Sequence, residues 1–93
     1  MPRKILVKGG FERAYRRLQQ TEKGLVDSAL GRFGAYLESG HAGAGLGITR
    51  LGSRTYEFRA GLDLRIVYIL ADNQVILALL GTHDEVRRFL KNQ

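Results

Sequence analysis

The residues best suited to chemistry are a histidine near the C-terminus and arginines in the second half of the chain. His83 stands where a strand-like stretch gives way to a helical one, and Arg65 interrupts an otherwise apolar run. A guanidinium in such a run is costly unless it reaches solvent or a partner. The chemistry open to an imidazole beside clustered arginines is proton transfer at a phosphate whose negative charge the arginines stabilise.

The position of Arg59 relative to Arg65 depends on the register of the hairpin between them. If residues 60–64 form the loop, the two arginines face each other directly; a loop one residue shorter sends them to opposite faces. Two guanidinium groups side by side repel without an anion, so the facing register favours a phosphate site. The alternative role for Arg65 is an ion pair with Glu57 or Asp63.

The second histidine, His41, lies in a Gly/Ala-rich stretch over residues 39–47 that is typical of a mobile loop. That mobility argues against a catalytic partnership with His83. The stretch lacks the Lys-Ser/Thr ending of a phosphate-binding loop. Two histidines without cysteine or a carboxylate cluster predict no metal site, and nothing in the sequence indicates a cofactor.

Composition limits the classes of function. The 93 residues predict a single domain, residues 1–93, and the net charge of +6 suggests an anionic partner such as nucleic acid or an acidic protein. The absence of cysteine fits a reducing cytosol and excludes a disulfide scaffold. The apolar run near the N-terminus is too short for a signal sequence or a membrane span. We therefore expect a cytoplasmic protein without membrane contact.

Hydrophobic periodicity predicts eight elements in α+β order. They are a strand over residues 4–8 closed by Gly9-Gly10, helical faces over 11–18 and 26–37, strands over 48–51, 54–59, 64–71 and 74–81, and a short C-terminal helix. Thr21 is expected to cap the second helix, and Thr82 with Glu85 forms a capping-box pattern before the last. The predicted fold is an N-terminal strand and an α-helical hairpin packed on a twisted antiparallel sheet of four to five strands, with a short C-terminal helix.

Four motifs in fixed order add to this pattern. They are GL-x-I-x-x-L at residues 45–51, YEFRAG at 56–61, LRIVYIL at 64–70 and LLGTHDEVRRFL at 79–90. In this order the chain resembles the RelE/ParE superfamily, the toxins of type II toxin–antitoxin pairs. The N-terminal strand and helical hairpin match the family layout too, so the resemblance covers nearly the whole chain. It implies a sheet with helices on one face and an open concave face opposite.

The resemblance also implies activity and partners. The RelE-like branch cleaves mRNA, usually on the ribosome, and the ParE-like branch inhibits DNA gyrase without nuclease activity. Both are neutralised by an acidic antitoxin. The expected partners are therefore an acidic cognate antitoxin, in a toxin–antitoxin hetero-oligomer, and the ribosome with its mRNA. We favour the ribosome-dependent, metal-independent endoribonuclease, with the gyrase inhibitor and an inactive antitoxin-binding relic as alternatives.

The resemblance assigns roles to particular residues. His83 would transfer a proton, Arg65 would contact the scissile phosphate with Arg59 beside it, and Arg50 and Arg54 would line the RNA path.

Two departures from the family pattern leave the general base unidentified. Residues 43–51 contain no Asp or Glu, and the terminal segment offers Phe89 in place of a tyrosine. Tyr56 and Tyr68 are substitutes in principle, but core aromatic roles are favoured for both.

Overall fold

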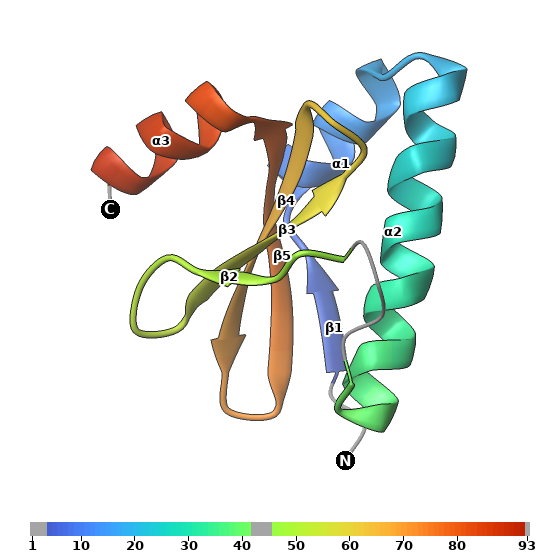
Figure 1. The fold of residues 1–93 in the computed structure, drawn as a ribbon. Helices are drawn as coiled ribbons and strands as arrows, with labels where there is room; N and C mark the ends of the chain where they lie inside the picture. The colour runs from blue at the N-terminus through green and yellow to red at the C-terminus, as the bar shows by residue number, and fades with distance from the viewer. Residues whose placement is uncertain (1–3, 42–45, 93) are drawn as a thin grey trace.

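The computed structural model describes residues 4–41 and 46–92, and it has the predicted α+β architecture (Figure 1). Its elements are β1 (Lys4–Val7), α1 (Gly9–Arg17), α2 (Gln20–Ser39), β2 (Thr49–Arg50), β3 (Thr55–Ala60), β4 (Leu64–Ala71), β5 (Gln74–Thr82) and α3 (His83–Lys91). The five strands form one sheet in the order β1-β5-β4-β3-β2. Within the described ranges, no helix is long and apolar enough to cross a membrane.

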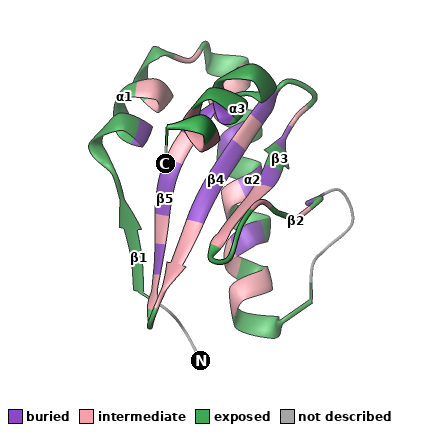
Figure 2. Cartoon of the chain, turned by 90° about the vertical axis from the view of Figure 1, so that its left-hand side faces the viewer, coloured by how far each residue is buried: buried purple, intermediate pink, exposed green. Residues whose placement is uncertain are grey.

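The sheet departs from a purely antiparallel arrangement at one edge. Strands β2 to β5 pair antiparallel, whereas β1 pairs parallel with β5. Parallel pairing requires a crossover, which α1 and α2 supply by carrying the chain over one face of the sheet. α3 lies on the other face: Figure 2 shows it in front of the sheet, with α2 behind.

The core lies between the helical hairpin and the sheet. The predicted stripe of α2 is confirmed, because Val26, Ala29 and Phe33 are at most 1% exposed. The ring of Phe33 stacks on Phe58 of β3 with centroids 4.5 Å apart and lies 4.6 Å from the ring of Tyr68 on β4. Figure 2 shows buried positions on the inner side of α2 and along β4 and β5. These aromatic contacts hold the helix against the sheet.

A hydrogen bond ties the two helices of the hairpin together. The Tyr15 hydroxyl on α1 donates to Asp27 Oδ1 on α2 at 2.7 Å. This bond stabilises the protonated phenol and raises the pKa of Tyr15 above its usual value.

Two predicted helix boundaries are wrong. Gly9 and Gly10 begin α1 instead of closing the first strand. Thr21 does not cap α2, because the cap is Gln19, whose backbone N–H donates to Glu22 Oε1 at 3.1 Å. The glutamate satisfies a free N–H at the helix start, so the helix begins before Thr21. Of the predicted 39–47 loop, residues 42–45 lie outside the described residues, and Gly40 ends α2 with a φ of 79°.

The turn between β3 and β4 depends on Gly61. Its φ is +85°, and a Cβ there would lie 2.8 Å from Leu25 Cδ1 on α2. We expect Gly61→Ala to lower the free energy of unfolding by about 1–3 kcal/mol, because it adds left-handed strain to a close contact. Urea denaturation measures this. Gly31→Ala, in α2 with nothing within 4 Å, is the control. It is expected to raise stability by about 0.5–1 kcal/mol. Equal effects of the two changes on the free energy of unfolding would contradict the strain and close contact assigned to Gly61.

Candidate catalytic site

The hairpin register places Arg59 and Arg65 directly opposite each other. Arg59 pairs with Arg65 and Ala60 with Leu64, so the turn contains only residues 61–63. Alternate residues of β4, including Ile66, pack in the core beneath the helices. The arginines therefore project from the other face of the sheet. Of the two predicted registers, the facing one is correct, and it places both arginines on one face of the sheet.

The guanidinium of Arg65 is partly buried without a partner. Its Nε and Nη1 atoms are shielded from solvent and have no hydrogen bond in the described part of the chain. The alternative role, an ion pair with Glu57 or Asp63, is not formed: the one ion pair among residues 4–41 and 46–92 joins Arg16 to Glu12. A buried donor without an acceptor costs about 1–3 kcal/mol or more, so it requires an explanation. An anion would satisfy these nitrogen atoms, and because both are shielded from solvent, the Arg65 side chain must move for an anion to reach them.

The capping box before α3 fixes the position of His83. The Thr82 N–H donates to Glu85 Oε1 at 2.8 Å, and the Glu85 N–H donates to Thr82 Oγ1 at 3.3 Å, as predicted. His83 is the first residue of the helix and is exposed. Gly81, directly opposite Arg65, permits this cap because a Cβ there would lie 2.9 Å from Glu85 Oε1. The start of α3 is thus held beside the strand pair that carries the arginines.

A cavity of about 560 Å³ is lined by both His83 and Arg65. We call it the cationic cavity after Arg65, although three carboxylates also line it. Its lining residues are Glu22, Leu62, Asp63, Leu64, Arg65, Thr82, His83 and Asp84. Two of the three predicted catalytic residues, His83 and Arg65, line it. Arg59 does not line it. Its side chain extends instead toward Gly47, where an added Cβ would lie 3.7 Å from Arg59 Cγ and Cδ.

The cationic cavity also contains carboxylates that sequence reasoning did not place there. Asp63 and Asp84 are exposed residues of its wall, and Glu22 of α2 lines it as a third carboxylate. Carboxylates within such a cavity are candidates for the missing proton acceptor. Asp84 directly follows His83 in the sequence, and this adjacency is the signal from which its place in the cavity could have been predicted. From the sequence, Asp63 is expected only as an ion-pair partner of Arg65. No group of three metal-ligating side chains gathers in the described residues.

Comparisons with known proteins identify the fold. No family model matches the sequence, and no curated protein matches it. Among solved structures, the YoeB dimer from Staphylococcus aureus is similar with a TM-score of 0.69 and 21% identity, over 89% of this chain and 99% of that one. The archaeal RelE–RelB complex from Pyrococcus horikoshii OT3 matches with a TM-score of 0.68 and 15% identity, over 88% and 96%. A copper-bound mutant toxin from Helicobacter pylori matches with a TM-score of 0.65 and 23% identity, over 90% and 98%. The chain has the RelE fold. The resemblance seen in the sequence motifs is confirmed at this level.

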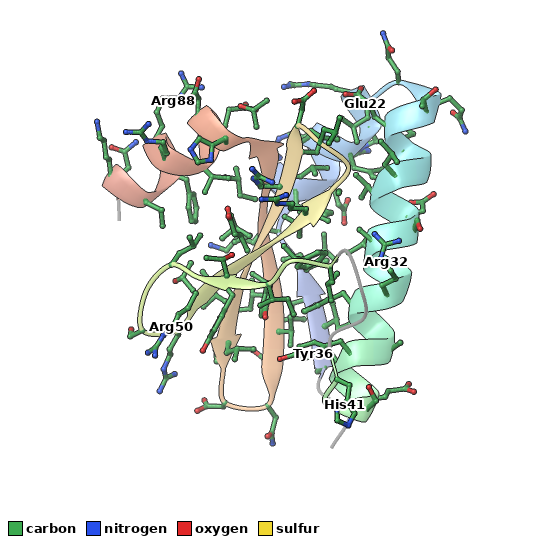
Figure 3. All side chains as sticks on the ribbon, viewed as in Figure 1. Glu22, Arg32, Tyr36, His41, Arg50 and Arg88 are labelled. Atoms are coloured by element: carbon green, nitrogen blue, oxygen red, sulfur yellow. The ribbon has the colours of Figure 1, made fainter. Side chains whose placement is uncertain are left out.

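The two arginines predicted to bind RNA lie away from the cationic cavity. Arg50 Nε and Nη2 donate to the carbonyls of Gly52 and Ser53, at 2.8 and 3.1 Å, and so close their own turn. Figure 3 shows Arg50 at this turn, far from the start of α3. Arg54 is an exposed residue of the same turn. A role for either in binding RNA therefore requires a substrate that extends along the sheet.

The remaining candidates do not reach the cationic cavity. His41 lies at the C-terminal end of α2, at the opposite end of the molecule from α3 (Figure 3), so it cannot act together with His83. Tyr56 and Tyr68 stack 5.4 Å apart as part of the core and its margin, as favoured from the sequence. Of the histidine and tyrosine candidates among the described residues, His83 alone lines the cationic cavity.

Proposed function

We propose that this protein is the toxin of a type II toxin–antitoxin pair and that it cleaves mRNA on the ribosome in the cytoplasm. The observation that carries the proposal is the cationic cavity: Arg65, with two unpartnered buried nitrogen atoms, shares it with His83. Cleavage of a phosphodiester requires a cation and a titratable group near the same phosphate, and both residue types line this cavity. The fold, shared with toxins such as YoeB and RelE, supports the same class of function.

The proposed reaction proceeds by transesterification. The 2′-oxygen attacks the adjacent phosphorus and loses its proton to a carboxylate of the cavity wall, Asp63 or Asp84. The bond from phosphorus to the 5′-oxygen breaks, and His83 donates a proton to that oxygen. Arg65 stabilises the charge on the pentacoordinate phosphorus, and Arg59, directly opposite it, adds to the positive potential. The products are a 2′,3′-cyclic phosphate and a free 5′-hydroxyl, and in the proposed steps side chains supply both proton transfers and the positive charge.

The proposed partner is an acidic antitoxin. Similar structures include toxin–antitoxin complexes, namely RelE–RelB, DinJ–YafQ and YoeB–YefM. The net charge of +6 on this chain favours a partner of opposite charge. A hetero-oligomer with such an antitoxin is therefore the inactive form that we propose.

The test is cleavage of an mRNA on translating ribosomes, with the cut positions mapped by primer extension and free mRNA as the control. Cuts that fall in phase with codons and require ribosomes are the expected result. Growth arrest without RNA cleavage, accompanied by DNA breaks, would contradict the proposal and indicate inhibition of DNA gyrase.

A further inference from the structure

Three exposed cations follow His83 along α3. They are Arg87, Arg88 and Lys91, and none of them makes an ion pair with another residue of the described ranges. The two acidic residues of the helix both lie in its first turn. The part of α3 that leads away from the cationic cavity therefore carries positive charge alone. Cations in a last helical turn also stabilise the helix dipole, so their exact positions must show whether they do more.

The apolar stripe of α3 fixes the direction in which each cation points. Val86 is 3% exposed, and the two apolar residues of the last turn are partly buried. Successive helical residues are about 100° apart around the axis. His83 and Arg87 therefore lie on one flank of the stripe, whereas Arg88 lies opposite it. Figure 3 shows Arg88 on the side of α3 that faces away from the sheet.

His83, Arg87 and Lys91 form one row along α3, because each is four residues from the next. Side chains at this spacing are neighbours on the helix surface. Four residues rise about 6 Å along the axis, which is comparable with the distance between successive phosphates of an extended RNA strand. With a phosphate at His83 in the cationic cavity, the next two phosphates along the strand can therefore meet Arg87 and Lys91.

We propose that Arg87 and Lys91 form a phosphate track, which holds the RNA strand on one side of the scissile bond. The track rests on the proposed RNA cleavage, because it begins at the phosphate that His83 and Arg65 would bind. It binds the backbone and carries no sequence information. An RNA strand fits better than an acidic protein, because the cations repeat at one spacing along a line that starts at the cavity.

Arg87→Ala tests the phosphate track, and Arg88→Ala is its matched control. The two changes remove the same exposed charge from adjacent positions of one helix, so their effects on net charge and on the helix dipole are nearly equal. On translating ribosomes, we expect Arg87→Ala to raise KM several-fold with a much smaller change in kcat, because the contact is made before and during the reaction alike. Arg88→Ala should leave KM close to that of the original protein.

Binding of an RNA that cannot be cut separates the track from the proposed function. The probes are 2′-O-methyl oligonucleotides of increasing length, in which the 2′-oxygen cannot attack the phosphorus. Their affinity should rise with each added phosphate and become constant once the track is filled. In Arg87→Ala this rise should be smaller. The slope of log K against log salt should also fall by about 0.7, the value for one phosphate contact with a single strand.

The outcomes distinguish the track from the nuclease. Length-dependent binding that Arg87→Ala weakens, in a protein that cuts no RNA, would support the track and overturn the nuclease. Cleavage with an unchanged KM in Arg87→Ala would overturn the track and leave the nuclease standing. Equal weakening by Arg87→Ala and Arg88→Ala would reduce the effect to net charge and also overturn the track. Tighter binding of a polyglutamate peptide than of the oligonucleotides, lost in Arg87→Ala, would assign the row to an acidic protein instead.

Discussion

Replacing His83 with alanine is expected to slow ribosome-dependent mRNA cleavage by roughly 10²–10⁴-fold and to leave the fold intact. This is the usual contribution of one general acid or base. The expectation depends on the position of His83 at the first residue of α3, where it lines the cationic cavity with Arg65. The capping box at that position uses Thr82 and Glu85, and it does not need the imidazole. Stability should therefore change by less than about 0.5 kcal/mol.

The control for this prediction is His41→Ala. It removes the other histidine, which is exposed at the far end of α2, and it should leave cleavage and growth arrest unchanged. Full toxicity of the His83→Ala protein would overturn the catalytic role of His83. Loss of activity accompanied by a lower melting temperature would show that the residue is structural instead.

The parts of the fold that the sequence predicts are those encoded by local patterns. The nearly continuous apolar run of β4 arises because Ile66 packs under the helical hairpin while Val67 is equally buried on the other face. The start of α3 is predictable because Thr82 and Glu85 are three residues apart and satisfy each other's backbone N–H groups. Both features depend on side chains that are close in sequence.

The parts that could not be predicted depend on contacts between distant residues. The hairpin register places Arg59 opposite Arg65 because the turn shrinks to three residues, with Gly61 against Leu25 of α2. No pattern within the hairpin encodes that contact. The carboxylates of the cavity wall were missed for the same reason, because Asp63 and Asp84 line one cavity only once β5 has returned beside β4.

Replacing Arg65 with methionine is expected to separate activity from stability. Cleavage should fall by about 10²–10³-fold, the cost of losing one group that stabilises charge in the transition state. The free energy of unfolding should stay the same or rise by about 1–3 kcal/mol, because Nε and Nη1 of Arg65 are buried without partners. Methionine has a similar length, can fill the same space and carries no charge to desolvate. Urea denaturation and the ribosome assay measure the two effects on one preparation.

The control is Arg32→Met on α2, an exposed arginine that donates to Ser28 Oγ at 2.8 Å (Figure 3). It removes the same charge from the molecule, so a general loss of attraction to RNA would appear in both proteins. We expect it to change stability by less than about 0.5 kcal/mol and cleavage only slightly.

The sign of the stability change distinguishes the two roles of Arg65. A structural arginine stabilises the native state, and Arg65→Met would then unfold more easily than the original protein. A guanidinium kept free for phosphate destabilises the protein alone and stabilises it once an anion binds. Methionine in its place should therefore leave stability unchanged or raise it in the absence of RNA, and it should remove the gain that the original protein shows with a bound oligonucleotide. Lower stability of Arg65→Met without RNA would overturn the phosphate-binding role.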